Sequence, residues 1–205
     1  GPRDGGTSHR RAVRAAADAM GGALTVELVA FATKELDPAS RASRDVLAAA
    51  LEDGADLLGA FVAMNPDPPA SLDALLDLAR DTGAPVDVHL DEHCDPSASW
   101  LEHLADATIA RGLEGRVTAG HCCALASLEV DRAQRVIEKV AAAGITVIAL
   151  PALNLYLQRR GAGTPRGRGI TLVHELLAAG VPVRFGSDNV RDPFYPYGDA
   201  DPLEA

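Results

Sequence analysis

Four side chains that can bind metal ions or transfer protons stand at the ends of three short apolar segments. His89 lies near the end of the first segment and Glu92 just after it, His121 ends the second, and Asp188 follows the third. Imidazoles and carboxylates are ligands of divalent metals and general acids or bases. Taken singly, each has a structural explanation, such as a histidine bonded to a loop or an aspartate that caps a turn. Their shared position at three segment ends favours a functional site.

The segment 86–91 alternates between apolar and polar residues. In a strand, its three apolar side chains share one face, while Asp87, His89 and Asp91 share the other. In a barrel, the apolar face meets the surrounding helices, so the polar face points into the lumen. We therefore expect His89 near the mouth and Glu92 just past the strand, where the chain turns over the opening.

Other candidate ligands are placed less favourably. Cys122 and Cys123 follow His121 directly, but adjacent residues of a strand point to opposite faces and rarely bind one ion together. We expect both thiols to be packed in the core. His103 and His174 fall within helical patterns, where exposure to solvent is expected.

The chain alternates between short apolar segments and amphipathic segments, which predict strands and helices, respectively. Successive strands begin 29 to 37 residues apart, the length of one βα unit, so parallel strands are expected. The predicted strands are 24–31, 57–63, 86–90, 116–120, 145–150 and 182–185, and the predicted helices are 10–20, 43–52, 71–81, 99–112, 127–143 and 170–179.

Six βα units could form an open doubly wound sheet or most of a (β/α)8 TIM-type barrel. An open sheet that binds a nucleotide would carry a glycine fingerprint after its first strand, and residues 31–35 contain no glycine. Reactive side chains at the carboxyl ends of several strands are typical of a barrel. We therefore predict an α/β fold in which residues 1–205 form a single partial (β/α)8 catalytic domain. About six of eight units would be present, with about 60 further residues upstream of Gly1.

Composition limits the classes of partner. The chain has 19 Lys and Arg against 29 Asp and Glu, and the net charge of −10 disfavours nucleic acid and anionic membranes. Three cysteines give no disulfide framework, so a cytoplasmic protein is expected. The uncharged stretch 140–157 contains Gly144, Pro151 and Asn154, and it divides into a helix end, a strand and a loop rather than a membrane span.

The sequence around these side chains resembles the amidohydrolase superfamily, and within it the cytosine deaminase-like branch. The resemblance extends over nearly the whole chain. The matching motifs are His-x-x-Glu at 89–92, Thr-Ala-Gly-His at 118–121, Asn-Leu-Tyr-Leu-Gln at 154–158, Arg-Gly-Ile-Thr at 168–171, and Gly-Ser-Asp-Asn-Val-Arg-Asp-Pro-Phe-Tyr-Pro at 186–196.

This resemblance implies one divalent metal ion, iron or zinc, and a role for each site residue. His89 and Asp188 would be metal ligands, and Asp188 would also act as the base. Glu92 would be the proton shuttle, and His121 would hydrogen-bond the metal-bound hydroxide that attacks the substrate. The family takes two further ligands from a His-x-His pair on its first strand; no such pair occurs in this chain, and it is expected upstream.

The resemblance also places substrate contacts at Thr33, Asn154, Gln158 and Asn189. Cytosine deaminases carry a glutamine where this chain has Thr33 and a second acid where it has Asn189. A site that hydrogen-bonds one ring discriminates strongly against rings without the matching groups. These two differences therefore predict a substrate other than cytosine itself.

The resulting expectation is a metal-dependent hydrolase that cleaves a C–N bond of a small heterocycle. The leading hypothesis is hydrolytic deamination of cytosine or of a related pyrimidine or triazine. Assembly of the protein into a homo-oligomer is compatible with this function. An N-substituted cyclic amide hydrolase with the same site, a non-catalytic binding barrel and, more remotely, an open nucleotide-binding sheet are the alternatives. Residues 1–205 alone are expected to be inactive because the His-x-His pair is missing.

Overall fold

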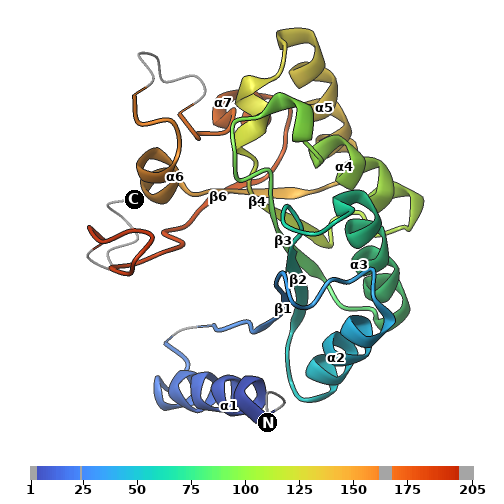
Figure 1. The fold of residues 1–205 in the computed structure, drawn as a ribbon, viewed down its shortest axis with the longest axis vertical. Helices are drawn as coiled ribbons and strands as arrows, with labels where there is room; N and C mark the ends of the chain where they lie inside the picture. Colours follow the sequence, from blue (N-terminus) through green and yellow to red (C-terminus); the bar gives the residue numbers. More distant parts are fainter. Residues whose placement is uncertain (1–3, 24, 162–167, 199–205) are drawn as a thin grey trace.

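Six parallel strands form one sheet in which sequence order and spatial order agree (Figure 1). The computed structural model describes residues 4–23, 25–161 and 168–198. The order β1-β2-β3-β4-β5-β6, with every neighbour parallel, is that of an arc of a (β/α)8 barrel and confirms the predicted fold class. The strands are β1 (Val29–Ala32), β2 (Leu57–Phe61), β3 (Val86–Leu90), β4 (Val117–His121), β5 (Thr146–Ala149) and β6 (Val183–Phe185).

The helices connect the strands, and α2 to α5 line one side of the sheet, whereas α6 and the segment after β6 lie on the other side (Figure 1). The α-helices are α1 (Asp4–Ala19), α2 (Arg41–Glu52), α3 (Pro68–Thr82), α4 (Leu101–Ala110), α5 (Val130–Ala142), α6 (Pro151–Leu157) and α7 (Val173–Ala178), and two short 3₁₀ helices are η1 (Pro96–Ala98) and η2 (Cys123–Ser127). No helix in the described ranges combines the length and apolar character that crossing a bilayer requires.

Helix α3 begins and ends at residues suited to those positions. The Asp67 side chain accepts a hydrogen bond from the backbone N–H of Ala70, and Pro68 occupies the first turn, where its missing N–H has no cost. The helix ends at Gly83, whose left-handed φ of 75° is easily reached without a side chain. These signals fix the bounds of a helix that must pack against β2.

The core lies between the sheet and the outer helices. On α3, Leu72, Leu75, Leu76 and Ala79 recur at helical spacing, and each is 0% exposed. Burial of each leucine stabilises the fold by about 1.5–3 kcal/mol, so these buried side chains stabilise the packing of α3 against the sheet. The apolar face of β3 is buried in the same core, as its alternation predicts.

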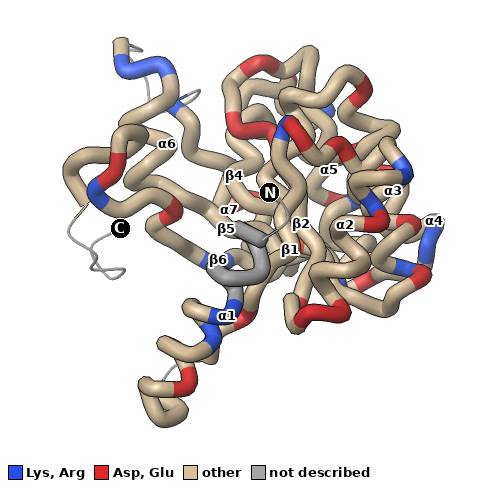
Figure 2. Tube along the Cα trace, turned by 60° about the horizontal axis from the view of Figure 1, so that its bottom comes forward, with Lys and Arg blue, Asp and Glu red and all other residues tan. Residues whose placement is uncertain are grey.

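Charged side chains on the outer helices alternate in sign and pair across neighbouring helices. Figure 2 shows acidic and basic residues interspersed along α2 to α5. Arg111, which directly follows α4, donates to Asp77 of α3 at 2.9 Å, and Lys139 of α5 donates to Asp106 of α4 at 2.8 Å. The outer surface of the described part therefore carries mixed charge, as expected of a solvated helical layer.

Most predicted bounds lie within three residues of the observed ones, and the larger differences are at α1, at β1 and after β5. α1 begins at Asp4 and not at residue 10, and β1 begins at Val29 and not at residue 24, which itself lies outside the described residues. The helix predicted at 127–143 is α5, and residue 127 instead ends η2. The prediction of a loop after β5 is wrong, because residues 151–157 form α6. Pro151 in its first turn is compatible with a helix start, and this signal was hidden by the apolar run before it.

Candidate active site

The carboxyl ends of β3, β4 and β6 bring the four predicted residues together. The register pairs His89 with Gly120 and Leu90 with His121, so the two histidines lie on adjacent strands. Their ring centroids are 4.8 Å apart. His121 Nε2 lies 3.8 Å from Glu92 Oε2 and 3.6 Å from Asp188 Oδ2, although the three residues are far apart in sequence.

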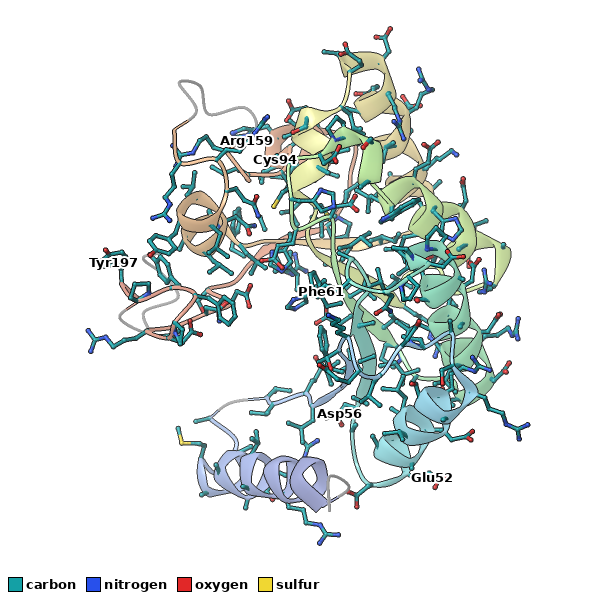
Figure 3. All side chains as sticks on the ribbon, in the orientation of Figure 1. Glu52, Asp56, Phe61, Cys94, Arg159 and Tyr197 are labelled. Carbon is teal, nitrogen blue, oxygen red and sulfur yellow. The ribbon has the colours of Figure 1, made fainter. Side chains whose placement is uncertain are left out.

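The site lies on the side of the sheet opposite to α2 and α3. Phe61, at the end of β2, is on this side (Figure 3), and it is the register partner of His89. The ring of Phe31 from β1 meets the His89 ring edge to face, with centroids 4.9 Å apart. Aromatic contact on one side and His121 on the other fix the plane of the His89 imidazole.

His121 is the most enclosed member of the site. Its side chain is 0% exposed, and its backbone φ of 69° turns the chain sharply at the end of β4. Nδ1 is 3.1 Å from the Asn154 side-chain oxygen, whereas Nε2 has no hydrogen-bond partner in the described part of the chain. Burial lowers the pKa of His121 to about 4, with a smaller contribution from nearby His89, so the ring is neutral at physiological pH.

Glu92 has the opposite shift. Burial raises its pKa to about 7, and the negative charge of Asp188 adds to the effect. The pKa of Asp188 is also raised, mainly by burial and further by Asp192, while His89 opposes the shift. A carboxyl group that keeps its proton close to neutral pH is suited to general acid catalysis, and a neighbouring carboxylate is suited to accept a proton.

The segment that carries Asp188 is held by its own side chains. Asn189 donates a hydrogen bond from Nδ2 to Asp192, whose other oxygen accepts from the backbone N–H groups of Phe194 and Tyr195 at 2.9 and 3.0 Å. These bonds lower the pKa of Asp192, with the Asn189 bond contributing most. The Asn189 amide thus has a partner within its own loop.

The other three predicted substrate contacts differ in their surroundings. Thr33 is exposed just after β1, and its hydroxyl donates to Glu35 at 2.9 Å. Asn154 is buried against His121, and Gln158 Nε2 donates to the backbone oxygen of Glu92 at 3.0 Å. The structure therefore connects two of the three, Asn154 and Gln158, with residues of the site itself.

The expectation that Asp91 faces the lumen is wrong. Asp91 leaves the strand with φ 54°, and it is only 1% exposed. Its carboxylate accepts hydrogen bonds from the Ser99 hydroxyl at 2.8 Å and from the backbone N–H groups of Trp100 and Leu101 at 2.8 and 3.2 Å. Asp91 therefore satisfies the otherwise unpaired donors at the start of α4.

The thiols that follow His121 are packed as predicted. Cys122 and Cys123 are both 0% exposed, and burial raises the pKa of each. Of the two helical histidines, His174 is exposed as expected. His103 is half-buried, and its Nε2 lies 3.2 Å from an Asp73 oxygen, so the expectation of a solvated ring holds for it only partly.

A cluster of aromatic rings beside the site was not identified from the sequence. The ring centroid of Tyr156 on α6 lies 5.5 Å from that of Tyr195 and 5.6 Å from that of Tyr197. The Arg160 guanidinium lies 4.6 Å from the centroid of the Tyr156 ring. Tyr197 stands beside α6 in Figure 3, so the cluster joins α6 to the loop that carries Asp188. Aromatic residues make up only 4% of the chain, and the presence of all three tyrosines after residue 155 was the sequence feature that could have indicated this cluster.

The donor set fits a divalent metal ion. His89, Glu92 and His121 each offer a ligand atom, and these atoms lie within 4.8 Å of one another. An oxygen of Asp188 is 3.6 Å from His121 Nε2, the buried nitrogen without a partner. Imidazole nitrogens combined with carboxylate oxygens suit zinc or ferrous iron. The three residues whose ligand atoms lie this close are His89, Glu92 and His121. The predicted ligands were His89 and Asp188, so the assignment of the ligands stays a prediction.

Comparison with known proteins identifies similar chains. A model of the amidohydrolase family matches residues 5–205. A pterin deaminase from Rhizobium rhizogenes is 49% identical over 159 residues, which are 77% of this chain and 36% of that protein. Each of the curated relatives is matched over less than half of its length.

Two solved structures share the fold over nearly the whole chain. The 5-methylcytosine deaminase from Klebsiella pneumoniae, liganded with phosphonocytosine, has a TM-score of 0.87 and 32% identity, covering 98% of this chain and 50% of its own. The N-isopropylammelide isopropylaminohydrolase from Burkholderia multivorans has a TM-score of 0.76 and 29% identity, covering 95% and 47%.

Proposed function

This chain belongs to the amidohydrolase family, and we propose that the whole protein is a metal-dependent hydrolase that removes an amino group from a small heterocycle. The observation that carries the proposal is the convergence of Glu92, His121 and Asp188 beside His89 at the carboxyl ends of the strands. In a barrel enzyme, this end holds the active site. In the overall reaction, water adds to the ring carbon that carries the amino group, the exocyclic C–N bond breaks, and ammonia leaves as the ring carbon becomes a carbonyl.

The side chains divide the proton transfers between them. A divalent ion held at this site would lower the pKa of a water molecule and so make it a better nucleophile. Asp188 accepts a proton from the attacking water, and Glu92 donates its proton to the adjacent ring nitrogen, which makes the ring carbon more electrophilic. Glu92 then takes part in delivering a proton to the departing amino group. His121 Nε2, buried and facing both acids, orients the oxygen that is being transferred.

For the substrate, we infer an amino-substituted bicyclic ring of the pterin type. The support is sequence similarity, since identity is 49% to a pterin deaminase and 32% to a 5-methylcytosine deaminase. Thr33 and Asn189, which differ from the cytosine deaminase pattern, are the proposed contacts to the ring edge. A threonine after β1 occupies less space than a glutamine, so it leaves room for a larger ring.

A second reaction with the same site is removal of an alkylamine from an N-substituted ring. It is favoured by the fold similarity to the isopropylaminohydrolase. Both reactions break a C–N bond by addition of water, and they differ only in the leaving amine. The size of the space around that amine would decide between them.

The test is a substrate panel with the purified full-length protein loaded with iron or zinc. The panel comprises pterin, 5-methylcytosine, cytosine, isocytosine and an N-alkylaminotriazine, assayed for ammonia, alkylamine and ring consumption. Ammonia release with the highest kcat/KM for pterin supports the proposal. Alkylamine release as the fastest reaction would favour the second candidate, and no release from any ring would overturn both.

We also infer a cytoplasmic protein that can form homo-oligomers. The three cysteines are free, and the two beside His121 are buried, as suits a reducing compartment. Cell fractionation tests the location, and light scattering of the full-length protein tests the assembly. Secretion in an oxidised form would contradict the first inference, and a monomer at all concentrations would contradict the second.

A further inference from the structure

We infer that α6 is the positioning element of this site, with Asn154 holding the imidazole of His121 and Gln158 holding the backbone of Glu92. Both are then positioning residues and not substrate contacts. Asn154 lies in α6 and Gln158 is the residue that caps its carboxyl end, so one short element holds groups from β4 and from the end of β3. The activity measurements below rest on the proposed function, whereas the spectroscopic measurement does not.

The Asn154 contact selects one form of the His121 ring. Asn154 is 1% exposed, and its Oδ1 is 3.1 Å from His121 Nδ1, so both partners are shielded from water. An amide oxygen only accepts, and therefore the proton of the neutral ring is on Nδ1. The lone pair of Nε2 then points at the space shared by Glu92 and Asp188. Without the asparagine, nothing described in the structure would prefer this tautomer.

The Gln158 contact fixes the turn after β3. Its Nε2 donates to the backbone oxygen of Glu92 at 3.0 Å across 66 residues of sequence. The stem of Gln158 packs closely on Gly169, where an added Cβ would lie 2.6 Å from Gln158 Cγ and 2.9 Å from the Asn154 backbone oxygen. Gly169 also has φ +87°, a conformation that favours glycine. The Gln158 side chain therefore has little room to move, and its hydrogen bond holds the backbone of Glu92.

The helix itself is anchored at its end. Arg168 Nη2 donates to the Leu155 backbone oxygen at 3.0 Å, one of the carbonyls of the last turn that has no partner within the helix. The backbone N–H of Gln158 donates to the oxygen of Asn154 at 2.8 Å, which closes the last turn. Tyr156 contacts Tyr195 of the loop after β6. A short helix held at these points can position His121 of β4 and Glu92 after β3.

The first experiment substitutes Asn154 in the metal-loaded, full-length protein. Asn154→Leu removes the acceptor at similar volume, and Asn154→Asp retains it. We expect the leucine variant to lose about 10- to 100-fold in kcat, by a similar factor for every active ring of the panel, with KM changed less than about threefold. The aspartate variant should recover most of that loss. A rise in KM that differs between rings would show a substrate contact and overturn the inference.

The second experiment observes the ring without any substrate. In protein labelled with 15N-histidine, the two nitrogens of a neutral imidazole have distinct chemical shifts that report which one carries the proton. We expect His121 to show protonated Nδ1 in the wild type and a mixed or inverted pattern in Asn154→Leu. An unchanged spectrum would overturn the role of Asn154 even if the panel assay fails, so the two proposals are tested separately.

The third experiment concerns Gln158. Gln158→Met removes the donor at similar length, and Gly169→Ala should displace the same side chain. Both are expected to lower kcat about tenfold or more with metal content retained. The matched control is Gln134→Met, because Gln134 is exposed on α5 and bonds only Glu138 among the described residues. Wild-type kcat in Gln158→Met with an unchanged melting temperature would overturn the role of Gln158.

Discussion

Glu92 combines a half-buried carboxyl with a pKa of about 7, and this combination is the one expected of the general acid that we propose it to be. The Glu92→Gln substitution keeps the size of the side chain but removes the proton that can be transferred. In the full-length protein, we expect folding and metal content to be retained and kcat to fall by about 10²-fold or more. Steady-state kinetics with elemental analysis measure both quantities.

The matched control for this substitution is Glu138→Gln on the exposed face of α5. Glu138 contacts Gln134 and lies outside the site, so the kcat of the Glu138→Gln variant should equal that of the wild type. Near-normal turnover in Glu92→Gln would remove Glu92 from the mechanism. Loss of metal in that variant would instead indicate that Glu92 is a ligand, as its place in the group of three ligand atoms allows.

The pKa values of Glu92 and His121 are shifted in opposite directions. The pH ranges over which the two shifts change the stability of the fold overlap. The pKa of Glu92 is raised from 4.5 to about 7 on folding, so its contribution is present below pH 4.5 and is lost as the pH rises through 7. The pKa of His121 is lowered from 6.5 to about 4, so its contribution is present above pH 6.5 and is lost as the pH falls through 4.

In the metal-free, full-length protein, these two contributions should partly cancel between pH 4.5 and 6.5. Glu92→Gln removes the first contribution and leaves the second. The melting temperature of this variant relative to the wild type should therefore increase as the pH is raised from 4.5 to 7. If the difference in melting temperature between the variant and the wild type stays constant from pH 4.5 to 7, the carboxyl of Glu92 is not buried as the structure describes.

Strand β2 approaches its neighbours so closely at Gly59 that a side chain has no room. An added Cβ would lie 2.5 Å from the Asp87 backbone oxygen and 2.8 Å from the Phe31 ring. Gly59→Ala should destabilise the protein by about 1–3 kcal/mol, because the nearest obstacle is backbone and cannot rotate away. The displaced Phe31 ring would press on His89, so metal affinity should also fall.

Equilibrium unfolding in denaturant measures this change, with Gly161→Ala as the control. An added Cβ at Gly161 meets nothing within 4 Å, and that variant should be within about 0.5 kcal/mol of the wild type. Equal stability of the two variants would mean that β2 and β3 are farther apart than described.

The strands that carry the site could be predicted because the cause of each is local. In β3, alternation of apolar and polar residues matches the period of a strand, and the predicted bounds of 86–90 agree with the structure. The end of β4 was similarly marked by His121. Parallel pairing followed from the spacing of the strands, and it places both histidines at one edge without further information.

Other features depend on contacts that spacing does not contain. Asp91 was assigned to the lumen by alternation, but hydrogen bonds from Trp100 and Leu101 turn it towards the start of α4. Helix α6 was missed because its seven residues are too short for a clear helical period. The pairing of Asn154 with His121 requires knowing that α6 folds back over β4, which only tertiary structure shows.

Across the chain, the sheet has two ends, and each presents an unpaired edge in the described residues. β1 bonds only β2, and β6 bonds only β5, so the backbone groups on their outer sides have no strand partner there. Phe185, the last residue of β6, is 60% exposed. Exposed strand edges beside apolar side chains promote association with other chains. A closed barrel would remove both edges.

The 205-residue polypeptide expressed alone should therefore behave differently from the complete protein. His89, Glu92, His121 and Asp188 provide fewer imidazoles than a site with a further histidine pair, so affinity for iron or zinc should be weak. We expect the polypeptide to aggregate, to purify with much less than one ion per chain, and to be inactive towards every ring of the panel. The complete protein should be soluble with close to one ion per chain. A monomeric 205-residue polypeptide that unfolds cooperatively and retains stoichiometric metal would show that these strand edges need no partner and that the four side chains suffice for the site.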